Sequence, residues 1–282
     1  MLKLFRSSLL LYIALLLAGI ALSVFFGGEI IILDNKVSPP FGLESWNPVM
    51  TVYYISTMIF ICAFVATIYA SKKNNNIVSL LNKECNPQLF INKYNKILKR
   101  NKGALRQYVL LQLSAGNLNL GDLQMARQML DTAASCGFSN TKQSASNQFH
   151  YYQLMCSLFL SANDIENAEK TLSYLKVSAQ NPKMYPVNKN STLSLCTSLQ
   201  FSINIEKGIY DGAEQFFNNA FDIASIPIEK VSNKFFLGKI YMYFNRTEEA
   251  KTAFEYVIAN GNKIICVKKA QQFLNQINGE QI

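Results

Sequence analysis

Residues 237–254 read LGKIYMYFNRTEEAKTAF, and this stretch decides the fold of the chain. Leu237-Gly238 and Tyr241 lie on one face of a first helical segment, and Ala250 and Phe254 lie one turn apart on a second. A small residue such as Ala250 lets two antiparallel helices approach closely. The stretch therefore predicts a pair of short helices that stack on copies of themselves.

The same pattern occurs in four places along the chain. Each copy has a turn, an acidic or polar start, an alanine and, four residues later, a large apolar residue. Acidic side chains at a helix start stabilise its free N–H groups, and here they are Asp122, Asp164, Asp211, Glu248 and Glu249. The alanines are Ala126, Ala168, Ala213 and Ala250, spaced by 42, 45 and 37 residues, and each copy follows an apolar helix expected at 104–115, 148–161, 192–206 or 233–244.

On these residues the sequence resembles the tetratricopeptide repeat family. The copy at 237–254 has the Leu-Gly, Tyr, Ala and Phe of the family pattern, but Lys234 and Asn262 stand where the family has Trp and Pro. The resemblance covers roughly residues 104–260. It implies a right-handed α-solenoid of helix hairpins, each stabilised by stacking on its neighbours. Residues 264–278 are expected to cap its open end, with a buried stripe of Cys266, Ala270, Phe273 and Ile277.

Two apolar runs precede this region. No charged residue occurs between Leu9 and Phe26 or between Pro48 and Ala70, and about 20 residues of helix cross a bilayer. We therefore expect two transmembrane helices, at about 8–26 and 48–70, joined by an outside loop at 27–47. The alternative for residues 1–26 is a cleaved signal peptide, since Lys3 and Arg6 precede an apolar core. Under either alternative the second span would hold the chain in the membrane.

Basic charge is concentrated after the second run. Residues 72–107 hold nine Lys and Arg against one Glu, a net charge of +8, whereas residues 108–282 hold fifteen against fourteen. Basic flanks stay on the cytoplasmic side, so this chain is predicted to be a multi-pass protein of the cell membrane with both termini in the cytoplasm. The nearly neutral remainder argues against nucleic acid as a partner. The residues expected to lie near anionic lipid are Lys72, Lys73, Lys93, Lys96, Lys99 and Arg100.

The resulting domain organisation is all-α in three parts. Residues 1–71 are the membrane anchor, 72–102 a basic juxtamembrane helical segment, and 103–282 the repeat domain with its capping helix. Within the second part, apolar residues at 90, 91, 94, 97 and 98 form a helical stripe. This helix could lie on the membrane surface or form the first helix of the stack, and the pattern leaves both possibilities open.

The residues that carry chemistry in enzymes are sparse. His150 is the single histidine, the six cysteines are scattered, and no glycine-rich phosphate loop occurs. We therefore predict that the chain is not an enzyme and uses no catalytic residue, cofactor or metal. The family resemblance instead implies a groove lined by the first helix of each pair, suited to a peptide or a partner helix. On this chain its residues are Gln153, Ser157, Ser161, Ser198, Ser202, Lys239 and Tyr243.

Together these patterns predict a membrane-anchored scaffold that binds a protein or peptide partner at the cytoplasmic face. The alternative is a transmembrane sensor, in which the outside loop receives a signal and the repeats report it. The sequence determines neither the partner nor the oligomeric state.

Overall fold

The structure is a computed structural model that describes residues 30–32, 35–37, 48–99, 101–139, 141–183 and 189–279. It consists of two compact units, Met1–Asn76 and Ile77–Ile282. The first predicted span, at 8–26, and Arg100 lie outside the described residues.

The first unit contains one small hairpin and most of a long helix. Strand β1 (Ile30–Ile32) pairs antiparallel with β2 (Asn35–Val37), and Ile31 lies opposite Lys36. Helix α2 (Pro48–Asn82) has 35 residues, and its last turns belong to the second unit. Within the described residues, no helix has a stretch long and apolar enough to cross a membrane.

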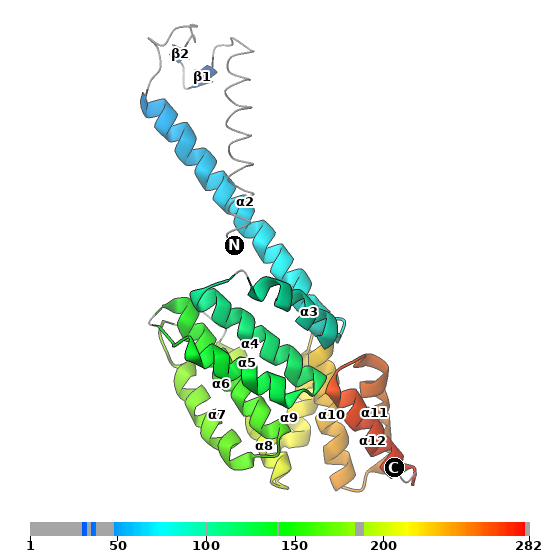
Figure 1. Ribbon diagram of the computed structural model, residues 1–282. Coiled ribbons are helices and arrows are strands. Elements are labelled where there is room, and N and C mark those ends of the chain that lie inside the picture. Colours follow the sequence, from blue (N-terminus) through cyan, green and yellow to red (C-terminus); the bar gives the residue numbers. More distant parts are fainter. Residues whose placement is uncertain are drawn as a thin grey trace. The chain divides into compact units, whose positions relative to one another are not determined.

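The described residues of the second unit form helices only, so the all-α prediction is confirmed apart from the short β1–β2 hairpin. These helices follow one another as antiparallel pairs joined by short turns (Figure 1). Their bounds are α3 (Pro87–Leu98), α4 (Gly103–Leu120), α5 (Leu123–Ser135), α6 (Lys142–Ser161), α7 (Ile165–Ala179), α8 (Lys189–Glu206), α9 (Ala213–Ile223), α10 (Pro227–Tyr243), α11 (Thr247–Asn260) and α12 (Ile265–Ile277).

One turn geometry recurs in four hairpins: α4–α5, α6–α7, α8–α9 and α10–α11. In each turn a backbone N–H bonds the carbonyl oxygen five residues earlier, as Asp122 N does to Asn117 O at 2.9 Å and Arg246 N does to Tyr241 O at 2.8 Å. This bond is typical of a helix that ends in a left-handed residue. The left-handed residues are Gly121, Asn163, Gly208 and Asn245, which have the same spacings of 42, 45 and 37 residues as the alanines. The architecture is therefore repeat-like in its backbone geometry as well as in its sequence.

A small residue on the first helix of a hairpin faces the alanine of the second. Ser114 Oγ donates to the carbonyl oxygen of Ala126 at 3.0 Å, and Cys156 Sγ donates to that of Ala168 at 3.5 Å. In the last hairpin the same place holds Gly238, where a Cβ would lie 2.5 Å from a ring carbon of Phe254. The helices of these three hairpins can therefore pack closely along their lengths.

The third hairpin departs from this geometry. Phe201 occupies the place of the small residue, and α8 and α9 contact each other only sparsely. The second helices of the other hairpins begin two residues after the left-handed residue, but α9 begins only at Ala213, because Gly212 is also left-handed at φ +70°. Asp122 and Asp164 cap their helices as expected, whereas Asp211 precedes the N-cap Gly212, which makes no side-chain cap bond.

The two ends of the second unit meet. The sequence predicts an open row with a polar-backed cap, but α12 packs against α4 as well as α11 (Figure 1). Cys85, in the α2–α3 loop, is fully buried in the apolar cluster of the last hairpin with Val231, Phe254 and Ile264. The row is therefore closed, and its ends cover each other.

Helix α3 is the first helix of this stack. Its apolar side chains Phe90, Ile91 and Tyr94 are buried in a cluster with residues of α4 and the end of α2. A Cβ at Gly116 of α4 would lie 2.7 Å from Ile91, so the two helices approach closely there. The lysines of α3 and of its C-cap face solvent, because Lys93, Lys96 and Lys99 are all exposed.

Candidate partner-binding surface

A shallow hollow lies at the irregular start of α9, beside the α10–α11 turn. Its volume is about 440 Å³, and the unwound segment before Ala213 opens it. We call its lining residues, together with Tyr243, the turn surface: Tyr210, Asp211, Gly212, Glu214, Gln215, Asn218, Tyr243 and Phe244.

Three aromatic rings form the apolar part of the turn surface. The rings of Tyr210 and Tyr243 stack with centroids 3.8 Å apart, and Phe244 meets Tyr243 edge to face at 5.1 Å. Tyr243 and Phe244 are nevertheless 55% and 50% exposed. Mutual contact restricts the rotamers of these rings, so the cluster presents apolar area that is already ordered before any partner binds.

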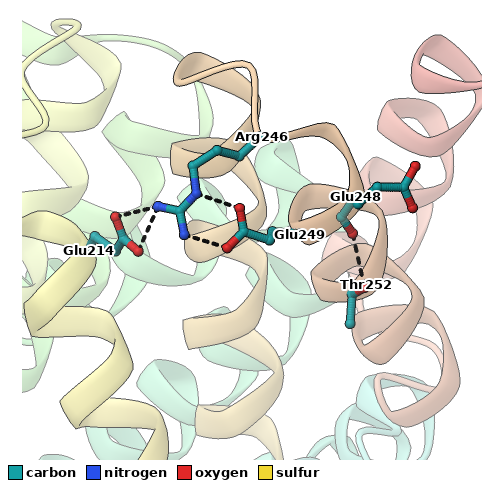
Figure 2. Close-up of polar contacts among 5 residues, drawn as sticks. All are labelled: Glu214, Arg246, Glu248, Glu249 and Thr252. Atoms are coloured by element: carbon teal, nitrogen blue, oxygen red, sulfur yellow. Dashed lines mark hydrogen bonds and ion pairs between the residues drawn. The ribbon is translucent and has the colours of Figure 1, made fainter.

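Arg246 holds Glu214, one of the two acids of the turn surface, in place. Its Nη1 donates to both carboxylate oxygens of Glu214 at 2.9 Å, and its Nε and Nη2 donate to those of Glu249 (Figure 2). The guanidinium also lies over the ring of Tyr241, 4.5 Å from its centroid. These bonds lower the pKa of Glu249 below its ordinary value. The start of α9 is thereby joined to the start of α11.

The neighbouring acid of α11 has a different environment. Glu248 points away from Arg246, and its backbone carbonyl accepts a hydrogen bond from Thr252 Oγ1 at 2.9 Å (Figure 2). Adjacent helix residues do not face each other, so this pair does not form a two-carboxylate site.

Two of the predicted groove residues lie at or beside this surface. Tyr243 belongs to it, and Lys239 forms a partly buried ion pair with Glu206 at the end of α8. Because Lys239 is paired within the chain, its charge is largely neutralised there. The charged lining residues of the hollow are the acids Asp211 and Glu214, and none is basic.

The other predicted groove residues lie on α6 and α8, and their hydrogen bonds stay within their own helices. Gln153 Oε1 accepts from His150 Nδ1 at 3.1 Å, and Ser202 Oγ donates to the carbonyl oxygen of Ser198 at 2.9 Å. Ser202 is buried, Ser157 half-buried and Ser161 exposed. The contacts of these residues do not bring them together with the turn surface.

The residues predicted near lipid are exposed where the structure describes them. Lys72 and Lys73 follow a run of exposed apolar side chains on α2. The members of that run are Ile59, Phe60, Ile61, Phe64, Val65, Ile68 and Tyr69.

Comparisons with known proteins give no relative for this chain: no protein-family model, curated protein or solved structure matches it. Within the described residues, no three His, Cys, Asp or Glu side chains are grouped so that they could hold a metal ion. The class that the fold defines is an all-α, helical repeat-like protein.

Sequence reasoning did not single out Arg246, Glu214, Tyr210 or Phe244 as site residues. The available signal was the Asp211-Gly212 pair in the third copy of the repeat. It delays the start of α9, the second helix of that hairpin, whereas in the other copies the second helix is already under way at this point. A glycine at that place permits the left-handed backbone that shortens α9. Which side chains then line the hollow depends on the neighbouring hairpin.

Proposed function

We propose that this chain is a membrane-anchored helical-repeat scaffold, similar in architecture to tetratricopeptide repeats, that binds a protein or peptide partner at the cytoplasmic membrane face. The observation that carries the partner-binding part is the turn surface, with its ordered aromatic rings, half exposed, beside an acidic hollow. Exposed aromatic residues of this kind are enriched at protein interfaces and often dominate their energetics.

The exposed apolar run of α2 supports the membrane part. Ile59, Phe60 and Ile61 are consecutive and all exposed, and successive helix residues are about 100° apart. The apolar side chains therefore surround the helix instead of forming one stripe for a protein core. Residues 48–70 contain no charged residue, and Lys72-Lys73 follow at the end where basic flanks stay in the cytoplasm.

The lining of the hollow suggests the chemistry of the partner. Asp211 supplies negative charge, whereas the charge of Glu214 is paired with Arg246, and Tyr210 and Phe244 supply ring surface. An arginine or lysine side chain can meet a carboxylate and lie over a ring at the same time. Arg246 already does both within this chain, with Glu214 and Tyr241. We therefore propose a partner segment with a basic residue next to an apolar one.

A photo-crosslinking amino acid at Gln215, inside the hollow, tests this function in intact membranes. We expect a discrete protein adduct that disappears when Tyr243 and Phe244 are both replaced by alanine, because most of the exposed ring surface is then lost. The adduct should also weaken as salt is raised, since a basic partner is attracted electrostatically.

Two controls make this result specific to the turn surface. The same crosslinker at Gln271, an exposed position of α12, should not capture the same protein. Replacing Tyr174, an exposed aromatic residue of α7, with alanine should leave the adduct unchanged. Identical adducts from Gln215 and Gln271, or an adduct insensitive to the double alanine variant, would contradict the proposal.

A further inference from the structure

The loop after α2 makes direct contact with the last hairpin, far along the chain. Asn262 Nδ2 donates to the carbonyl oxygen of Glu84 at 2.7 Å, across 178 residues of sequence. Next to it, Lys263 N donates to the carbonyl oxygen of Cys85 at 3.2 Å. Two adjacent hydrogen bonds therefore join the α2–α3 loop to the α11–α12 loop.

Apolar packing reinforces these bonds on both sides. The Cys85 side chain is fully buried in the cluster of Phe254, Val257 and Leu274. In the opposite direction, Ile228 of α10 packs against the cluster that contains Ile77 and Leu81 at the end of α2. Each end of the row therefore contributes a residue to the core of the other.

The backbone at this contact is left-handed on both sides. Cys85 has φ +49° and Asn262 has φ +50°, so a left-handed non-glycine residue stands on each side of it. Asparagine tolerates that conformation, but cysteine rarely adopts it. Strain of this kind persists only while the surrounding contacts impose it, and it accumulates at elements that switch between two states.

We propose that the contact between Glu84-Cys85 and Asn262-Lys263 is a latch that closes the row of hairpins and whose opening releases α10–α12 together from the end of α2. Because Cys85 follows the last turn of α2 by only three residues, a displacement of that turn pulls on the latch directly. If the chain is a transmembrane sensor, the latch would transmit a movement of the anchor to the repeats. The latch does not depend on the partner proposed above.

The cysteines of the chain report on the latch without any added label. Cys85 and Cys266 belong to the cluster of the last hairpin, whereas Cys156 and Cys196 belong to a separate cluster of α6, α7 and α8. Burial raises the pKa of the Cys85 thiol, and it raises the pKa of Cys266 to about 12. Because Cys85 is fully buried, an alkylating reagent reacts with it mainly when the latch opens, and the half-buried Cys266 reacts faster when its cover is removed.

The test is pulsed alkylation of the purified full chain in detergent micelles, read for each cysteine by mass spectrometry. Asn262→Gly keeps the left-handed backbone but removes the donor to Glu84. We expect alkylation of Cys85 and Cys266 to speed up about threefold to tenfold, as the loss of one hydrogen bond allows, with Cys156 and Cys196 unchanged. Asn262→Asp is a variant of nearly the same shape that also lacks the donor and should behave alike.

Asn163→Gly is the matched control, because it makes the same replacement at a left-handed position in the α6–α7 turn. It should leave the rates of Cys85 and Cys266 at the wild-type value. Unchanged rates at Cys85 and Cys266 in both Asn262 variants would overturn the latch. An equal acceleration at all four cysteines would also overturn it, because the bond would then support only the stability of the whole unit.

Discussion

Buried amide side chains join the first two hairpins at the scale of single residues. Gln107 Nε2 donates to the carbonyl oxygens of Ala133 and Gly137, at 3.0 and 3.1 Å. Asn147 Nδ2 donates to the Gln107 side-chain oxygen at 3.0 Å, and both residues are almost fully buried. A buried amide without partners is costly, so these bonds specify how α4, α5 and α6 meet.

His150 takes part in a second polar contact between α4 and α6. An amide NH₂ can only donate, so Gln112 Nε2 donates to His150 Nε2 at 3.4 Å, and Nδ1–H donates to Gln153 at 3.1 Å. The imidazole is therefore neutral in the fold. Burial lowers the pKa of His150 below its ordinary value, although the bond to Gln153 opposes this shift.

This depressed pKa predicts a dependence of stability on pH. Above pH about 6.5 His150 is neutral in both the folded and unfolded chains, so its contribution is fully present. Below that pH the unfolded chain binds the proton first, and stability falls by at most about 1.4 kcal/mol per pH unit. Melting temperatures at pH 7.5 and 5.5 should therefore differ more for wild type than for His150→Gln. Equal differences would show that His150 does not titrate on unfolding.

At the scale of elements, the packing of the two helices of a hairpin depends on the sizes of two residues, one on each helix, at equivalent places in every copy of the repeat. In the first two hairpins these places hold Ser114 and Cys156 on the first helix and Leu130 and Leu172 on the second, whereas the last hairpin holds Gly238 and the larger Phe254. The third hairpin has phenylalanine at both places, Phe201 and Phe217, whose rings lie 6.3 Å apart. A large residue on each helix cannot occupy one close contact, which explains why α8 and α9 contact each other only sparsely.

Gly238→Ala tests this pairing in the last hairpin. A Cβ there would lie 2.5 to 2.9 Å from three ring carbons of Phe254, so the substitution should destabilise the repeats by about 1–3 kcal/mol. In a Phe254→Leu background, which reproduces the leucine of the first two hairpins, the same substitution should cost much less. Urea unfolding of the four variants followed by circular dichroism measures the coupling. Additive costs would show that the two residues do not restrict each other.

Closure of the row is the main property at the scale of the whole second unit. A solenoid with open ends relies on polar-backed caps. Here Cys85, from the α2–α3 loop, is buried in the cluster of the last hairpin, and α12 packs against α4. Of the predicted stripe of α12, Ala270 is buried and Cys266, Phe273 and Ile277 are half-buried, whereas Leu274, which the prediction did not include, is buried; Lys268 and Lys269 are exposed as expected. Burial against both α11 and α4 limits the fraying that an end helix would otherwise show.

The proposed topology of the chain can be tested with Cys136, which is exposed at the end of α5. A membrane-impermeant maleimide should label it only after sealed cells are permeabilised, because the repeats are proposed to face the cytoplasm. Cys136→Ser should abolish the rapid labelling and so identify the site. Labelling of Cys136 in sealed cells would reverse the orientation.

Helix positions, turn positions and the repeat were predictable from the sequence, because each follows from residues within a few turns of one another. The alanines and the left-handed Gly and Asn residues have the same spacing, so a local pattern marks every hairpin. The stripe of α3 likewise predicted a helix with Phe90, Ile91 and Tyr94 on one face, but not whether lipid or protein covers it. Of the turn surface, only Tyr243 was predicted.

The sequence by itself determined that this chain forms helix hairpins at regular intervals after two apolar runs, since helical periodicity and capping act locally. Only the tertiary structure decided that Cys85 enters the last hairpin, that Asn262 bonds Glu84, and that the third hairpin opens beside Arg246. Those contacts join residues that are distant in the chain, and each is one weak interaction among many. Their selection therefore depends on how all the hairpins pack together, which no local pattern records.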